Sequence, residues 1–403
     1  MKRRQRSLHF HPVRSDARRS FRRGISLHGH TQHSREGLGF LNRYVDAVPG
    51  VAQLARHGMA RFRQEHGANL DFSRAFWTAP LSPRQAHDLE RKQIEDSLDL
   101  EGSVSLTDHD NIDGAMEWPA DEGHEVVVSL EWTLPYGPAG FHLGVHNLPR
   151  EQARELTARL LAYSAAPEES QLPGLLATLD GMPHVLVVLN HPFWAMESLD
   201  PAALQTLLSR FLRSYGRYIH ALEVSGLRPW KENQQVLEMA EGLSMPIVSG
   251  GDRHGWEAGT MLNLSGAGSF SEFVAEVRGD GRSEIVVMPA YQKPYGLRMM
   301  QIAWDLLRDY PTPPGGRRHW TERIFFEWND GRVTPLSRSF KGPTAPELVL
   351  LVRLMMQLEK QPWHSLVHAA WSLSSLKGAV PPRDRAQRPA AGHAFPSGER
   401  SAA

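Results

Sequence analysis

Short runs of apolar, often β-branched residues recur along the chain from residue 24 onward, and polar stretches separate them. Runs of this kind are typical of buried β-strands. The predicted strands span residues 24–30, 104–110, 125–132, 142–148, 184–191, 219–226, 245–254 and 284–288. Apolar residues at helical spacing predict helices at 150–161, 201–215, 231–243, 270–277 and 296–308. The alternation predicts an α/β fold with parallel strands, in either an open sheet or a closed barrel.

Two segments interrupt this alternation. Residues 37–98 separate the first two predicted strands and contain a helical stretch at 84–100 and an aromatic cluster of Phe72, Phe76 and Trp77. Because this insertion leaves the end of the first strand, it either caps the strand ends or forms a peripheral helical pair. In the second segment, 311–378, we predict a C-terminal extension with a short strand at 323–328 and a long helix at 345–376.

The remaining parts of the chain are its two ends. Residues 1–23 are rich in Lys and Arg and are predicted to be a basic, mobile arm. Residues 379–403 are rich in Pro, Arg, Ala and Ser and are predicted to be disordered. We therefore expect one α/β domain at 24–310, followed by the extension and the tail.

Composition narrows the function. The 403-residue chain carries 45 basic and 45 acidic side chains, and this formal neutrality argues against binding polyanions through bulk charge. The absence of cysteine excludes disulfides, thiolate metal ligands and a cysteine nucleophile, whereas histidine occurs 20 times. No apolar run approaches the about 20 residues of a membrane span, and no secretory signal follows the arm, so we predict a cytoplasmic protein.

Nearly every predicted strand ends in a residue that can bind a metal ion. These residues are His28, His30, Asp108, His109, Asp110, Glu131, His142, His191, Glu223, Asp252 and His254. Because the carboxyl ends of parallel strands meet at one rim, we expect these side chains to converge. Positions i and i+2 share a strand face, so a His-x-His pair can hold one ion. A single histidine is more often structural, but recurrence at strand after strand predicts a metal centre with nitrogen and oxygen ligands.

These residues fall in motifs that resemble a known family. The motifs are His28-Gly29-His30-Thr31, Leu106-Thr107-Asp108-His109-Asp110, Glu131, His142-Leu143-Gly144, Asn190-His191-Pro192 and Gly251-Asp252-Arg253-His254. In order and spacing they are similar to the motifs of the PHP (polymerase and histidinol phosphatase) family, over about residues 24–265. The resemblance implies a distorted (β/α)7 barrel, two or three divalent ions (Mn, Zn or Fe), and hydrolysis of phosphoesters.

The resemblance also implies which residues hold each ion. It groups His28, His30, Glu131 and Asp252 at one ion, His142 and His191 at a second ion bridged by Glu131, and His109 and His254 at a third. The family's first motif usually provides an aspartate for the third ion, but Arg35 follows Ser34 in this chain. Either Glu36 or His33 replaces that acid, or only two ions bind. His146 competes with His142, and the spacing favours His142.

Adjacent divalent ions suit phosphoester hydrolysis, because they acidify water toward hydroxide and stabilise charge on phosphoryl oxygens. We therefore predict attack by a metal-bound hydroxide on a small phosphorylated metabolite or nucleotide. The predicted catalytic residues are Asp252, His254 and His191, and the predicted phosphate-binding residues are Arg35, Arg228 and Arg253. Arg35 is the first choice because it stands where the acid is missing.

Four further residues are predicted to support the site. Asp108 and Asp110 either hold an imidazole N–H or act as ordinary loop residues, and Asn190 orients the segment carrying His191. Glu223 is expected to be a buried carboxylate bonded to an arginine or a backbone amide.

Three other functions remain open at this point. A nuclease of the same family is disfavoured by the neutral charge, although the basic arm is compatible with it. A metal-binding regulatory module would follow if catalysis were lost with the missing aspartate. A metal-dependent C–N hydrolase is also compatible, because fold and metals do not determine which bond is cleaved.

Overall fold

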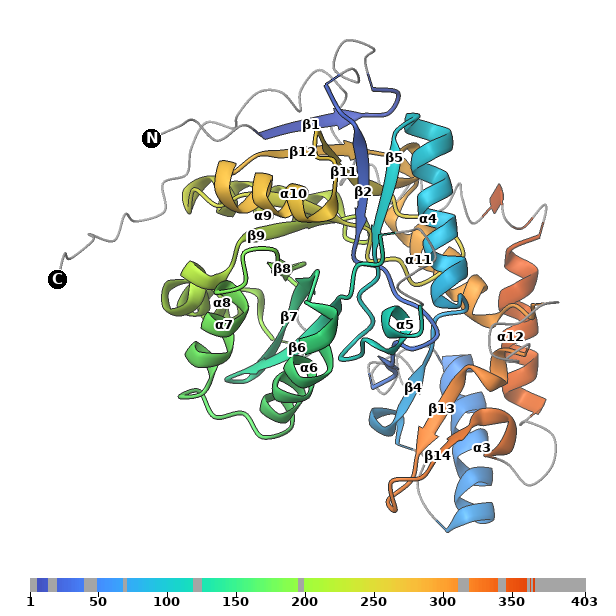
Figure 1. Ribbon diagram of the computed structural model, residues 1–403. Coiled ribbons are helices and arrows are strands. Elements are labelled where there is room, and N and C mark those ends of the chain that lie inside the picture. Colours follow the sequence, from blue (N-terminus) through green and yellow to red (C-terminus); the bar gives the residue numbers. More distant parts are fainter. Residues whose placement is uncertain are drawn as a thin grey trace.

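The computed structural model describes residues 6–13, 20–39, 49–67, 71–118, 125–194, 199–310, 319–339 and 346–360, with residues 363, 365 and 366. Strands in this part of the chain form three sheets, which we call the first, second and small sheets. In Figure 1 the small sheet lies at the lower right, beside α3 and α12.

The first sheet combines strands from both halves of the chain. Its order is β1 (Arg6–Phe10), β12 (Ser283–Val287), β11 (Met261–Ser265), β2 (Arg23–Leu27) and β5 (Glu101–Ser105). Helix α4 (Pro83–Leu98) packs on this sheet through Ile94 and Leu98. It begins at Ser82, which forms a reciprocal capping box with Gln85, as the Ser-Pro-x-Gln sequence favours. Helix α10 (Phe270–Ala275) packs its phenylalanines on β2.

The second sheet holds most of the hydrophobic core. Its order is β10 (Ile247–Gly250), β9 (Ala221–Ser225), β8 (Leu186–Asn190), β7 (Ala139–His146) and β6 (Leu130–Tyr136). The helices on this sheet are α6 (Arg150–Ala165), α7 (Leu172–Asp180), α8 (Pro201–Tyr215) and α9 (Trp230–Gly242). Apolar residues of these helices and strands, such as Phe141, Leu189 and Phe211, form one buried cluster. The short helix α5 (Asp113–Met116) follows β5.

The small sheet joins the predicted insertion to the predicted C-terminal extension. Its order is β14 (Val333–Pro335), β13 (Ile324–Glu327), β4 (Ala75–Trp77) and β3 (Glu36–Gly37), and all its pairs are antiparallel. Three helices lie beside this sheet: α3 (Pro49–His66), α11 (Tyr295–Leu307) and α12 (Pro346–Leu358). Phe62 of α3, Trp77 of β4 and Phe326 of β13 share one buried cluster. The insertion therefore folds together with the extension.

The predicted (β/α)7 barrel is wrong. In the described residues the strand pairing divides into three sheets and does not close into a ring. Strands β6 and β7 form an antiparallel hairpin, since only Gly137 and Pro138 connect them, whereas a parallel pair needs a crossover of about a dozen residues. The hairpin places Glu131 opposite Gly144 and Thr133 opposite His142. Strand β11, which the sequence analysis missed, is antiparallel to β2 and β12.

The first and second sheets approach each other at the loops that follow their strands. An isolated parallel bridge joins Gly29, after β2, to Arg253, after β10. A second bridge joins His109, after β5, to Glu131 in β6. The predicted ligand segments of the two sheets are therefore hydrogen-bonded neighbours, although the described strands form no closed barrel.

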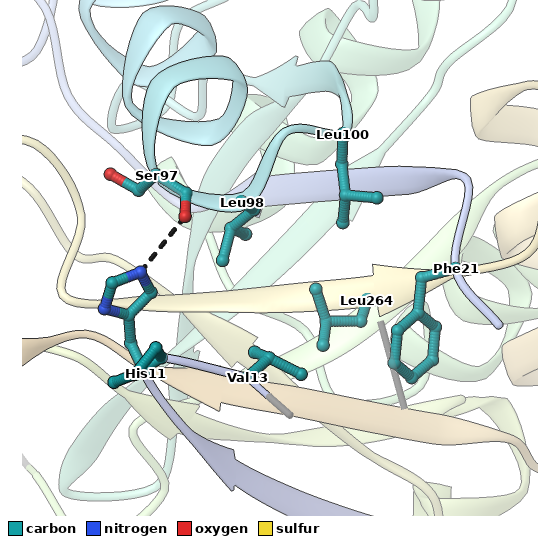
Figure 2. A pocket seen from close by; sticks show the side chains of 8 residues that line it. His11, Val13, Phe21, Ser97, Leu98, Leu100 and Leu264 are labelled. Carbon is teal, nitrogen blue, oxygen red and sulfur yellow. Dashed lines mark hydrogen bonds between the residues drawn. The ribbon is translucent and has the colours of Figure 1, made fainter. Parts of the chain in front are cut away.

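One described segment of the predicted N-terminal arm forms a strand. Residues 6–10, predicted to be mobile, form β1 in parallel with β12, and Leu8 and Phe10 pack against the main core. His11 donates a hydrogen bond of 3.0 Å to the carbonyl oxygen of Ser97 (Figure 2). Val13 packs near Leu264 in the same pocket. Apolar residues at alternate positions therefore dock this segment despite its basic charge.

The other end of the chain is described only in part. The helix predicted at 345–376 is observed as α12 over Pro346–Leu358, and most of its remainder lies outside the described residues. The tail predicted at 379–403 lies outside them entirely. None of the described helices has the length and hydrophobicity needed to cross a bilayer.

Docking of β1 can be tested with Phe10. Phe10→Ala should lower the free energy of unfolding by about 1–2 kcal/mol, because a partly buried aromatic side chain leaves the core. Phe10→Leu, which keeps an apolar side chain there, should lose less. Urea denaturation followed by circular dichroism measures both, and a wild-type midpoint for Phe10→Ala would show that β1 contributes no packing.

Candidate metal centre

Backbone conformation directs several candidate ligands out of the strand ends. His28 follows β2, His191 follows β8 and Asp252 follows β10, and all three have positive φ angles of 62°, 25° and 48°. Such angles are uncommon for residues other than glycine and are often found at functional sites. They turn the chain sharply at the end of each strand, so that the side chains enter the space between the two sheets.

One group of side chains is completely buried. Nε2 of His28 lies 3.2 Å from Oε2 of Glu131, and Nε2 of His30 lies 3.5 Å from the same oxygen. Both imidazole nitrogens lie 3.6 Å from Oδ1 of Asp252. These four residues, predicted to hold one ion, are therefore brought together, and their assignment as ligands stays a prediction.

The atoms of this group are suited to a cation. Nε2 of His28, Nε2 of His30 and Oε2 of Glu131 are buried and form no hydrogen bond. Polar atoms buried without a partner are costly, so their convergence is unfavourable unless something else binds them. A divalent ion accepts the imidazole lone pairs and the carboxylate oxygens together, and this nitrogen and oxygen set suits Mn, Zn or Fe.

The second oxygen of Glu131 faces a different pair of imidazoles. Oε1 lies 3.2 Å from Nδ1 of His142 and 3.2 Å from Nε2 of His191. The side-chain amide of Asn190 donates to the same oxygen at 2.9 Å, so it orients Glu131 itself. Glu131 therefore has the arrangement of a carboxylate shared between two ions.

A third group lies closer to the surface. Oε2 of Glu36 is 3.2 Å from Nε2 of His109 and 3.3 Å from Nε2 of His254. Candidate ligand atoms of these residues and of His30 all lie within 4.8 Å of one another. Glu36, one of the two alternatives to the missing acid, thus faces both predicted ligands of the third ion. The other alternative, His33, pairs with a different carboxylate, because its Nε2 lies 3.5 Å from Oε2 of Glu117.

Electrostatics keeps His30 and the carboxylates in the protonation states that a cation requires, whereas at His28 and His109 burial is outweighed by nearby carboxylates, which raise the pKa, at His109 to about 10. Burial lowers the pKa of His30 to about 3, which leaves its imidazole neutral. Burial alone would raise the pKa of Glu131, but nearby imidazoles, His28 foremost, hold it well below its usual range. Burial is likewise outweighed at Glu36, where His109 contributes most to a lowered pKa. The carboxylates are therefore ionised at neutral pH.

Buried residues around these ligands hold them in place. Glu223 accepts a hydrogen bond of 2.6 Å from Nδ1 of His28 and one of 2.8 Å from the backbone amide of His191. An arginine or a backbone amide was predicted as the partner of Glu223, and the structure gives a backbone amide and an imidazole. A carboxylate behind a histidine fixes its tautomer, and here it leaves Nε2 free to bind an ion. Glu223 therefore orients ligands of both sheets.

Two predicted supporting residues bind the backbone rather than an imidazole. Asp108 accepts from the amide and the hydroxyl of Thr31 at 2.5 and 2.7 Å, which anchors the segment that follows His30. Asp110 accepts from the amide of Thr133 at 2.8 Å. The alternative to His142, His146, is hydrogen-bonded through Nδ1 at 2.8 Å to the hydroxyl of Ser105.

Ser34 is a functional candidate that the sequence analysis missed. Its hydroxyl donates to Oε1 of Glu36 at 2.7 Å and lies 3.1 Å from Nδ1 of His30. It also accepts from the backbone amide of His109 at 3.1 Å. One hydroxyl therefore links three candidate ligands, and a lone serine after a His-x-His motif carries no signal of this role.

The three predicted phosphate-binding arginines occupy different environments. Arg35 is exposed and stacks on Phe76, with its guanidinium carbon 5.0 Å from the ring centroid. Arg253 is buried and pairs with Glu90 at 2.9 Å, and it also donates to backbone carbonyls. Both guanidinium groups therefore have structural partners, and their assignment as phosphate ligands stays a prediction.

Arg228 is the arginine that reaches the candidate metal centre. Its Nη2 lies 3.5 Å from Oδ2 of Asp252, and its guanidinium carbon lies 4.6 Å from the ring centroid of Trp194. The Trp194 ring also lies 5.1 and 5.3 Å from the imidazoles of His191 and His142. Trp194 was not predicted as a site residue. Its ring lies beside two candidate ligands and contacts the guanidinium of Arg228.

Comparison with known proteins assigns no family. The chain matches no protein-family profile and no curated protein sequence. A solved structure that it is similar to is an amidohydrolase from Chromobacterium violaceum with bound sulfate and no metal. That similarity covers 58% of this chain and 89% of the other, with 14% identity and a TM-score of 0.34. The resemblance to the PHP family therefore stays a prediction from the motifs.

Gly250 provides a test of how Glu223 supports the centre. A Cβ atom at Gly250 would lie 1.6 Å from Oε1 of Glu223 and 2.8 Å from Cβ of His28. Gly250→Ala must therefore displace Glu223 and should weaken binding of divalent ions by roughly 10- to 100-fold. Gly279→Ala is the control, because its Cβ would meet nothing within 4 Å. Zinc titration measures both, and unchanged affinity in Gly250→Ala would exclude the supporting role.

Proposed function

We propose that this protein is a metal-dependent phosphoesterase that hydrolyses a small phosphorylated metabolite or nucleotide. The observation that carries the proposal is the position of Glu131, whose two oxygens face different sets of imidazoles. Oε1 lies 3.2 Å from His142 and His191, and Oε2 lies 3.2 Å from His28 and His109. A buried carboxylate between two imidazole sets is the arrangement expected for a pair of neighbouring divalent ions.

Bound ions would supply positive charge to phosphoryl oxygens and lower the pKa of water toward neutrality. The protein's own contribution is to hold the carboxylate ligands ionised and the imidazoles in fixed positions. Asn190 holds Oε1 of Glu131, and Glu223 holds His28 and the backbone of His191. These contacts fix the relative positions of both imidazole sets before any substrate arrives, which lowers the cost of reorganisation during the reaction.

Arg228 supports the choice of an anionic substrate. Its backbone carbonyl accepts from the hydroxyl of Tyr291 at 2.9 Å and from Arg298 at 3.2 Å, so the start of its side chain is anchored. Its Nε atom is buried and forms no hydrogen bond. A fixed guanidinium with donors to spare, beside a carboxylate of the centre, suits an equatorial phosphoryl oxygen. This cation and the motif resemblance favour a phosphoester over a C–N bond.

Among the predicted catalytic residues, His254 is the most accessible. Its side chain is 10% exposed, compared with 4% for His191 and 3% for Asp252. We therefore place His254 where the leaving group departs, while His191 and Asp252 act as buried ligands. The imidazole stacks 4.2 Å from the ring of His30, so it borders the inner ligands directly.

The proposal predicts that hydrolysis depends on bound metal. Elemental analysis should find at least two divalent ions per chain, and a panel of nucleotides, sugar phosphates and a chromogenic ester should reveal a substrate. His30→Ala and Asp252→Asn should each lower turnover by at least roughly 100-fold. His184→Ala, which removes an exposed imidazole, should be neutral. Full activity in chelator-treated protein would contradict the proposal, and bound ions without turnover would favour a regulatory module.

Arg228 should affect substrate binding more than metal binding. Arg228→Gln should raise KM by roughly 10- to 100-fold, because a charge-assisted contact to the phosphoryl group is lost. Metal content should stay at the wild-type value, since Arg228 supplies no ligand atom. Arg159→Gln removes an exposed arginine of α6 and is the control. An unchanged KM in steady-state assays of Arg228→Gln would remove Arg228 from the substrate site.

A further inference from the structure

Glu36 lies in an unusually short element. Strand β3 consists of Glu36 and Gly37 only, and it pairs with Trp77 and Phe76 of β4. Leu38 continues the pairing through a hydrogen bond of 2.9 Å from its amide to the carbonyl of Ala75. A pair of such short strands is not stable alone in water, so the position of Glu36 depends on what packs against β4.

The partner of β4 on its other edge comes from the C-terminal extension. Strand β13 pairs Ile324 with Trp77 and Phe326 with Ala75. The amide of Thr78 also donates to the carbonyl of Arg323 at 2.9 Å. Residues almost 290 positions apart in the sequence, Glu36 and Ile324, therefore flank the same residue of β4, because both pair with Trp77.

Alternation along these strands separates two faces of the small sheet. Leu38, Trp77 and Phe326 share one buried cluster, and Glu36 lies two residues before Leu38 on the same face. The opposite face carries the stack of Phe76 on Phe325, with ring centroids 5.1 Å apart, and Arg35 lies over Phe76. The alternation explains why Glu36 faces the imidazoles while its neighbour Arg35 does not.

The same face of the small sheet also contacts a second candidate ligand. The ring of Trp77 lies 5.7 Å from the imidazole of His254. The loop after His254 is held from the C-terminal side as well, because Asp305 of α11 accepts from the amide of Trp256 at 2.6 Å. Glu36 and His254, two ligands of the outermost ion position, are thus both supported by elements near the small sheet.

We propose that β13 of the C-terminal extension is a positioning element for the outermost ion, acting through Glu36 and Trp77. This inference rests on the proposed metal centre and assigns the extension a function within it. Phe326 is the residue that transmits the effect, because its buried side chain packs the β13 face against Trp77 and Leu38. The inner ions, held by ligands from the two larger sheets, do not depend on it.

The test uses the full-length protein, freed of metal with a chelator and titrated with Zn²⁺ against a chromophoric indicator. Phe326→Ala should weaken the weakest zinc site by roughly 10- to 100-fold or abolish it, while the tighter sites keep their wild-type affinity. Phe325→Ala, on the opposite face of the same strand, is the matched control and should bind every ion as the wild type does. Phe326→Leu should restore most of the lost affinity.

A double variant distinguishes positioning from general damage. Glu36→Gln should lose the same zinc site, and adding Phe326→Ala to it should cause no further loss, since both act on one carboxylate. If Phe326→Ala does not fold by circular dichroism, Phe326→Leu should still show a smaller loss confined to the weakest site.

Three results would overturn the inference. These are wild-type affinity at every site in folded Phe326→Ala, equal losses in Phe325→Ala and Phe326→Ala, and weakening of all sites together. Each of them leaves the proposed function intact, provided that the wild-type protein binds zinc. A wild-type chain that binds no divalent ion would instead overturn the proposed function and this inference with it.

Discussion

The central constraint on this structure is the charge of Glu131, a carboxylate that is fully buried and must be neutralised by its neighbours. Glu131 is fully buried, and imidazole nitrogens of His28, His30, His109, His142 and His191 lie within 3.5 Å of its oxygens. An isolated buried carboxylate would be prohibitively costly, and neutral imidazoles alone cannot cancel its charge. Either the imidazoles carry protons or a cation lies among them. Nearby carboxylates outweigh burial and raise the pKa of His28 and of His109, so these imidazoles hold protons that a bound cation would displace.

This constraint accounts for several local features that would otherwise be unfavourable. Left-handed backbone at His28, His191 and Asp252 costs energy, and it is retained where it directs a ligand into the centre. Gly250 has no side chain because Glu223 occupies that space behind His28. Local strain and missing side chains around the centre are therefore consequences of assembling charged groups in a dry interior.

The sequence predicted the gathering of ligands better than the architecture that gathers them. His28, His191 and Asp252 follow strands as predicted, and they converge with Glu131 and His142, which lie within β6 and β7 rather than at strand ends. The parallel barrel failed because a regular alternation of runs does not report strand direction. The turn at Gly137 and Pro138, between two strands predicted to be parallel, makes β6 and β7 antiparallel. Arg35 and Arg253 were chosen for position in the sequence, and their partners, Phe76 and Glu90, could be found only in three dimensions. The contact between the extension and the insertion could not be predicted from the sequence either. Strands β4 and β13 are paired, but they lie too far apart in the chain for any local pattern to indicate the pairing.

The β6–β7 hairpin explains the eleven-residue interval between Glu131 and His142. Glu131 lies opposite Gly144, and His142 is two residues from that partner, on the same face of the neighbouring strand. Gly144 leaves room for Asn190, whose amide oxygen would lie 2.9 Å from a Cβ atom there. The interval is therefore set by the strand residues between each side chain and the turn, together with the length of the turn itself. A homologue with a longer turn would show a different spacing yet the same pairing, so distant relatives are better sought by aligning the two strands around a turn of variable length.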